Sequence, residues 1–332
     1  MTQFSRRNIL AGAAALPALA TALPLLSGVL ASSSAEAQTG SGQQVPSLYR
    51  YKIGGIEVTA VNDGVRTFPL PEGFVKNASR EEVNTALEAA FMPKDTMSIQ
   101  FNPLLLKTGG KLVLIDTGNG PQGGNASVGK LPANLAWAGV KPADIDTVVI
   151  SHFHADHING LRAEDGALAF PNAEILVPAA EWAYWMDDGE MSRAAEGLQG
   201  GFKNARRVFK DIDSRVTRYE WDKEIAPGLT AVDAAGHTPG HTAFVLADGN
   251  GKLFIQSDTT NLPQLFAVHP EWQVQFDMDG AKATETRKRI YDMIAAERLP
   301  ITGYHYPFPA VGFVRKNDGG YEVVPATWNP VL

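Results

Sequence analysis

Six positions within the stretch SHFHADHING carry four side chains of the metal-ligand type, namely His152, His154, Asp156 and His157. They follow the apolar run 147–150, which is typical of a buried strand. Because side chains two residues apart on extended backbone point the same way, His152 and His154 can share one ion. Asp156 and His157 lie where the chain should turn, and can face a second ion. The alternative is a solvated polar loop, but four such side chains behind a buried strand favour a metal site.

Three further ligand-type side chains lie just beyond later predicted strands, namely His237, Asp258 and His305. Loops beyond strand ends are where proteins usually build sites. The chain contains no cysteine, so a metal can be held only by histidine and carboxylate groups. Two divalent ions together need about six or seven nitrogen and oxygen ligands. Imidazole with carboxylate suits zinc, and manganese, iron and cobalt are alternatives.

The elements that must position these side chains are short strands alternating with helices. Strands are predicted at 49–53, 56–61, 104–106, 112–115, 148–150, 173–177, 229–232, 243–246 and 253–255, the first two as edge strands. Helices are predicted from a capping box at Ser79 through Phe91 and at 179–185, 202–212 and 281–297. Strands in two clusters separated by helices indicate an α/β fold in which two sheets pack together with helices outside.

The first 37 residues are predicted to be a twin-arginine-type export signal. Arg6 and Arg7 precede an alanine- and leucine-rich run, and 35–37 is a small-x-small cleavage site. Residues 38–46 would be a linker and 47–332 a single catalytic domain. The alternative is an uncleaved membrane anchor, which Pro17 and Pro24 disfavour. We therefore expect a periplasmic or secreted protein with no stable membrane anchor after cleavage.

Overall charge restricts the partners. The chain has 29 Lys and Arg against 36 Asp and Glu, a net charge of -7, and its basic residues are not clustered. Neutralising nucleic-acid phosphates requires clustered Lys and Arg, so we predict no nucleic-acid partner.

The ordered series His-x-His-x-Asp-His, Gly-His-Thr-Pro-Gly-His, Ser-Asp and a late histidine resembles the metallo-β-lactamase fold superfamily over residues 47–332. The resemblance implies a four-layer αββα sandwich with a dinuclear site at one edge. The ligands it implies are His152, His154 and His237 for one ion, Asp156, His157 and His305 for the second, and Asp258 as a bridge between them.

The same resemblance assigns roles around the metals. Asp258 and Asp156 are the implied catalytic carboxylates, with Asp258 also able to shuttle a proton. Asp116, in Asp-Thr-Gly, and His241 are expected to contact ligands rather than metal.

Within the superfamily, the chain is most similar to methyl parathion hydrolase and its lactonase and aryl-esterase relatives. This implies an exported hydrolase in which a hydroxide bridging two divalent ions opens lactones or cleaves aryl esters, with slower organophosphate triester hydrolysis. Relatives of this group are commonly dimers, so a homodimer is expected. Two alternatives stay open: a glyoxalase-II-like thioesterase, and a metal-binding or redox protein without hydrolytic function.

Two aromatic clusters are candidates for the wall of a substrate pocket. One contains Trp182, Tyr184 and Trp185, and the other contains Phe266, Trp272 and Phe276. Ligand sites are typically apolar, and we predict Trp185 as the pocket residue. The alternative for each ring is a place in the core or in a subunit interface.

Overall fold

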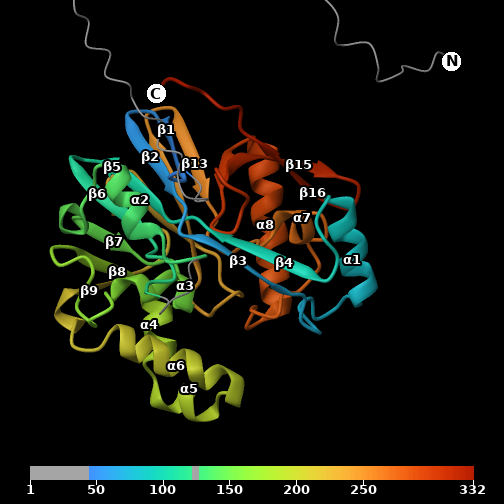
Figure 1. Cartoon of the computed structure of the whole chain (residues 1–332), viewed down its shortest axis with the longest axis horizontal. Helices are drawn as coiled ribbons and strands as arrows, with labels where there is room; N and C mark the ends of the chain where they lie inside the picture. Colours follow the sequence, from blue (N-terminus) through green and yellow to red (C-terminus); the bar gives the residue numbers. More distant parts are fainter. Residues whose placement is uncertain (1–44, 122–126) are drawn as a thin grey trace, which may run out of the picture. The chain divides into compact units, whose positions relative to one another are not determined.

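Two seven-stranded β-sheets form the centre of the structure (Figure 1). The computed structural model describes residues 45–121 and 127–332, so the predicted export signal lies outside the described residues. The first sheet runs in the order β1 (Leu48–Ile53), β2 (Ile56–Val61), β5 (Leu104–Thr108), β6 (Lys111–Ile115), β7 (Thr147–Val149), β8 (Glu174–Pro178) and β9 (Val216–Tyr219). Strands β6 to β9 are parallel, and the other neighbours are antiparallel.

The second sheet is antiparallel except for the parallel pair β13 and β14. Its order is β10 (Glu224–Ala226), β11 (Leu229–Asp233), β12 (Thr242–Asp248), β13 (Gly251–Ile255), β14 (Pro300–Thr302), β15 (Val311–Asn317) and β16 (Gly320–Pro325). A separate two-stranded sheet pairs β3 (Gly64–Pro69) with β4 (Thr96–Phe101).

Helices cover the outer faces of both sheets (Figure 1). They are α1 (Arg80–Ala89), α2 (Leu131–Trp137), α3 (Ala155–Ile158), α4 (Ala179–Trp185), α5 (Asp188–Arg193), α6 (Glu196–Val208), α7 (Pro263–Phe266) and α8 (Gly280–Glu297), with short 3₁₀ turns at Pro142–Asp144, Asn159–Leu161 and Asp213–Arg215. Among the described residues, no helix is both long and apolar enough to cross a bilayer.

Alternating side chains explain the four layers. Successive side chains of a strand point to opposite faces of the sheet. In β5, Leu104 and Leu106 pack against the second sheet, whereas Leu105 packs under the outer helices. On the other side, Phe254 of β13 packs against Ile290 of α8. The resulting order of helices, sheet, sheet and helices is the predicted αββα sandwich.

Most predicted elements are confirmed within two residues, including the capping box at Ser79. Two details differ. β2 is not an edge strand, because it lies between β1 and β5. Helix α6 begins six residues before the predicted start at 202 and ends at Val208. Its first half contains Gly197, Gly200 and Gly201, which lower helix propensity, so the sequence pattern did not predict the start of the helix. Gly201 is required by packing, because a Cβ there would lie 2.9 Å from the Trp185 ring.

Candidate metal centre

All seven predicted ligands follow the ends of sheet strands. His152 and His154 come directly after β7, and α3 begins behind them, so Asp156 and His157 lie in its single turn. His237, Asp258 and His305 follow β11, β13 and β14, respectively. β13 and β14 are parallel, so their carboxyl ends meet at one edge and bring the last two side chains together.

Three histidine nitrogens face one another at hydrogen-bonding distance. His154 Nδ1 lies 3.0 Å from His152 Nε2 and 2.9 Å from His237 Nε2. Burial, together with the neighbouring imidazoles, holds the pKa of His152 and His154 well below the usual value. Neutral imidazole is the form that binds metal, so the lone pairs of His152 and His154 suit a cation. At His237, burial is outweighed by hydrogen bonds to Asp258 and Asp277, which raise the pKa to about 9, so a metal ion would there replace a proton.

A second group contains Asp156, His157 and His305. Asp156 Oδ2 lies 3.6 Å from His157 Nε2 and 3.5 Å from His305 Nε2. These three side chains can converge on one ion.

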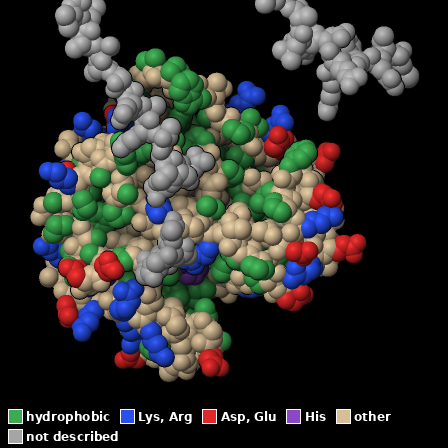
Figure 2. Space-filling view, in the orientation of Figure 1, with side chains coloured by type: hydrophobic (Ala, Val, Ile, Leu, Met, Phe, Trp, Pro, Cys, Tyr) green, Lys and Arg blue, Asp and Glu red, His purple; other side chains and the backbone are tan. Residues whose placement is uncertain are grey.

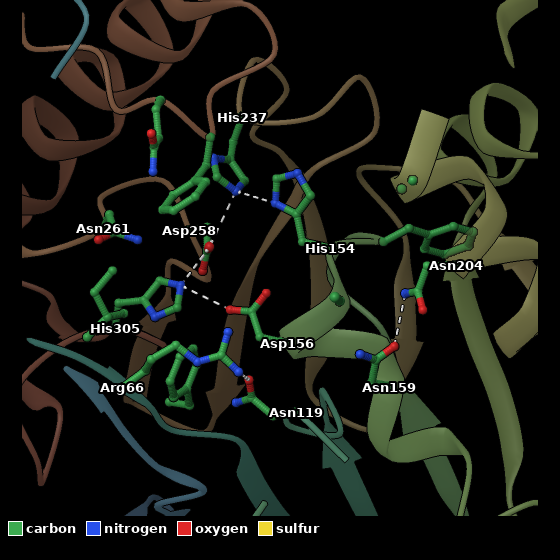
Figure 3. A pocket seen from close by; sticks show the side chains of 18 of the residues that line it. Arg66, Asn119, His154, Asp156, Asn159, Asn204, His237, Asp258, Asn261 and His305 are labelled. Carbon is green, nitrogen blue, oxygen red and sulfur yellow. Dashed lines mark hydrogen bonds and ion pairs between the residues drawn. The ribbon is translucent and has the colours of Figure 1, made fainter. Parts of the chain in front are cut away.

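Asp258 connects the two groups. Its Oδ2 lies 3.0 Å from His305 Nε2 and 3.3 Å from His237 Nε2, and its Oδ1 lies 3.4 Å from His157 Nε2. In Figure 3, His154, His237, Asp258, His305 and Asp156 point toward one centre. Among the described residues, the buried atoms Asp258 Oδ1 and His157 Nε2 have no hydrogen-bond partner. A buried polar atom without a partner is costly, and divalent cations would satisfy both atoms.

Hydrogen-bond acceptors behind the imidazole rings fix the orientation of three predicted ligands. His157 donates Nδ1–H to Asp116 Oδ2 at 2.8 Å, and His305 donates Nδ1–H to the Gln100 carbonyl at 2.7 Å. His237 donates Nδ1–H to Asp277 at 2.8 Å. In each case the Nε2 lone pair remains directed at the centre, an arrangement typical of metal-binding histidines.

His241 lies beside the centre but has both nitrogens engaged. Its Nδ1–H donates to the Ala234 carbonyl at 2.8 Å, and its Nε2 accepts the Asp258 N–H at 3.0 Å. Burial and the neighbouring His237 lower the pKa of His241 to about 3, which keeps Nε2 able to accept. His241 and Asp116 thus contact predicted ligands and lie outside the converging donor atoms.

The centre opens into a cavity of about 740 Å³. Figure 2 shows a histidine surface within a hollow near hydrophobic and basic side chains. Trp185 lines the cavity, with its ring 6.5 Å from that of His154. Of the other aromatic candidates, Phe276 also lines it. Trp182 and Tyr184 instead pack against the core around Phe209 and Phe202.

Sequence reasoning missed two buried carboxylates near the centre. Asp277, which holds His237, lies in a loop two residues before the α8 N-cap Asp279, and nothing local distinguishes it. Glu181 in α4 is fully buried beside Trp185. A glutamate on the apolar face of a short aromatic-rich helix was the available signal for it.

Comparison with known proteins agrees with this geometry. The family model described as the Metallo-beta-lactamase superfamily matches residues 100–299. Among solved structures, AidC, a dizinc quorum-quenching lactonase in complex with a product, aligns with a TM-score of 0.81 and 27% identity, covering 86% of this chain and 100% of AidC. A hydrolase of the beta lactamase superfamily, AbOPH, aligns with a TM-score of 0.80 and 26% identity over the same shares.

Curated relatives match over shorter stretches. An N-acyl homoserine lactonase from Bacillus sp is 26% identical over 166 residues, which is 49% of this chain and 57% of the relative. The lactonase AttM from Azorhizobium caulinodans is 33% identical over 122 residues, or 34% of this chain and 40% of the relative. The chain therefore spans about half the length of the curated relatives it matches.

Proposed function

Because this chain belongs to the metallo-beta-lactamase superfamily, we propose that it is a metal-dependent hydrolase that binds two divalent ions and opens lactones or cleaves aryl esters. The observation that carries the proposal is the position of Asp258, whose carboxylate contacts histidines of both donor groups. One carboxylate between two sets of nitrogen donors suits a pair of ions, which we propose to be zinc.

The seven predicted ligands form two groups that would each hold one ion, with Asp258 between them. His152, His154 and His237 would hold one ion, and Asp156, His157 and His305 the other. When bound, such ions supply a water of lowered pKa as nucleophile and polarise the substrate's scissile carbonyl. Asp258 would accept a proton from the attacking water on a carboxylate oxygen and then donate it to the oxygen of the leaving alkoxide. The Asp156 side chain is 24% exposed and that of Asp258 is 3% exposed, so Asp156 is the more accessible of the two carboxylates that line the cavity.

The cavity supports a small-molecule substrate. Most of its surface is apolar, with rings such as Phe68, Phe101 and Phe276, while Arg66 and several side-chain amides line it together with the donor cluster. Pockets of this size and character bind compact organic ligands by burying most of their surface. The similarity to the lactonase AidC and to the Bacillus lactonase favours lactones first. We propose aryl esters and organophosphate triesters as additional substrates.

The test is turnover by the purified mature chain. After zinc loading, initial rates are measured on γ- and δ-lactones, phenyl acetate, methyl parathion and a glutathione thioester, each with and without a chelator. Chelator-sensitive lactone or ester turnover supports the proposal. Turnover of the thioester alone would assign the chain to thioester hydrolysis instead.

Export and dimerisation are separate proposals. Twin-arginine export is tested by replacing Arg6 and Arg7 with lysine and measuring how much protein reaches the periplasm. A homodimer is tested by the mass of the zinc-loaded protein in solution.

A further inference from the structure

Glu181 is a fully buried carboxylate whose hydrogen bonds come from groups other than the predicted metal ligands. It lies in the first turn of α4, outside the converging donor atoms. Burying a charged group costs free energy unless hydrogen bonds compensate for the lost water. The donors that compensate at Glu181 come from three separate parts of the site.

Two of these donors are backbone groups of the loops that carry the three-histidine group. Oε2 accepts the N–H of Phe153 at 3.0 Å, and Phe153 lies between His152 and His154. Oε1 accepts the N–H of Gly240 at 2.7 Å, in the loop that begins at His237. One side chain therefore holds both loops at a fixed separation.

The third donor belongs to the cavity wall. Trp185, one turn further along α4, donates its indole Nε1–H to Oε2 of Glu181 at 2.6 Å. The same indole faces the His154 ring and lines the cavity. The carboxylate thus connects the histidine loops to the surface that substrate would touch.

Packing makes this contact tight. A Cβ added at Gly240 would lie 2.3 Å from the Glu181 backbone nitrogen, so only glycine allows the loop to approach α4 so closely. If either loop moved away, its N–H would remain buried without an acceptor.

We propose that Glu181 is a positioning residue, which sets the geometry of the His152, His154 and His237 group and ties it to Trp185. This role presupposes the metal-dependent function proposed for the chain. A glutamine at 181 has nearly the same shape but only one accepting oxygen, so in either orientation its NH₂ faces a donor. At least one anchor is then lost, and the three-histidine group loosens.

The test is a Zn²⁺ competition titration against a chromophoric chelator, with metal per chain measured in parallel. For Glu181→Gln we expect the ion of the three-histidine group to bind about 10- to 100-fold more weakly. The affinity for the other ion should be unchanged, and excess Zn²⁺ should restore kcat. Trp185→Phe, which keeps both loop anchors, should retain both affinities and change KM. Glu174 is an exposed glutamate on β8, so Glu174→Gln should change neither the Zn²⁺ affinities nor KM.

Wild-type affinity for both ions in Glu181→Gln would overturn the role, as would equal weakening of both ions, which would indicate a general effect on the fold. If that variant does not fold, Gly240→Ala forces the same loop from α4 without removing the carboxylate and should weaken the same ion. Unchanged affinity there would also overturn the role. Failure of the wild-type chain to bind Zn²⁺ would instead contradict the proposed function, and the role of Glu181 with it.

Discussion

His237 donates its Nδ1–H to Asp277 Oδ1 across 2.8 Å, and this contact fixes which nitrogen faces the metal centre. The other oxygen of Asp277 lies 3.3 Å from a guanidinium nitrogen of Arg287, which is also buried. A predicted metal ligand, a carboxylate and an arginine thus form one buried row behind the candidate site.

Replacing Asp277 with alanine should affect binding and stability together. The His237 ring loses its orienting acceptor. The zinc ion proposed to bind at the three-histidine group should therefore bind about 10- to 100-fold more weakly. Arg287 becomes a buried charge without its carboxylate, at a cost of about 3–5 kcal/mol in the free energy of unfolding. Zinc titration and denaturant unfolding measure the two effects, with Glu297→Ala at the exposed end of α8 as control. An unchanged zinc affinity would contradict the orienting role.

Asp116→Asn should weaken binding of the ion proposed to be held by Asp156, His157 and His305. Asp116 accepts from Ser151 N, Ser151 Oγ and His157 Nδ1, each at 2.8 Å. Its φ of 60° lies in the left-handed region, which asparagine tolerates, so the backbone should stay in place. An amide has only one accepting oxygen, so the His157 contact or a Ser151 contact is lost. Dialysis against graded chelator should remove the ion of Asp156, His157 and His305 first. Loss of the three-histidine ion first would show that the assignment is wrong.

Zinc should stabilise the folded chain. Metal that binds only the folded state adds RT ln(1 + [L]/Kd), or about 2.7 kcal/mol when free zinc is 100 times Kd. The thermal midpoint should therefore rise with zinc concentration and fall on chelation. Magnesium, which prefers all-oxygen sites, should give a smaller shift at the same concentration. A midpoint independent of zinc would mean that the donor cluster binds no metal.

Two cavity aromatics should separate substrate recognition from stability. Trp185 is 1% exposed, so Trp185→Ala should cost about 3–5 kcal/mol and also change specificity. Phe276 is 40% exposed, so Phe276→Ala should cost about 1 kcal/mol while raising KM for aryl esters more than for a small γ-lactone. Specificity constants for both substrates and unfolding curves provide the comparison. Equal specificity constants in wild type and both variants would show that these two rings do not contact the substrate.

The strands and the ligand series could be predicted because their signals are local. Apolar runs mark β5 to β8, and the residues behind β7 are identified by type and spacing alone. β3 and β4 were missed although Thr96–Phe101 alternates between buried and partly buried positions, because α1 separates the two strands along the chain and they pair only in the fold.

The supporting residues could not be found in this way. Asp277 meets His237 across 40 positions, and Glu181 meets Gly240 across 59. Such contacts depend on how the two sheets and α4 pack. A sequence without its fold does not reveal which of many carboxylates will be buried behind a ligand.

The most direct test is metal content of the purified mature chain, measured with initial rates of lactone hydrolysis on the same sample. The geometry of Asp258 between two donor groups predicts close to two zinc ions per chain and lactone turnover that chelation abolishes and zinc restores. One ion or none, with no hydrolysis of lactones or esters after reconstitution, would contradict the dinuclear hydrolase.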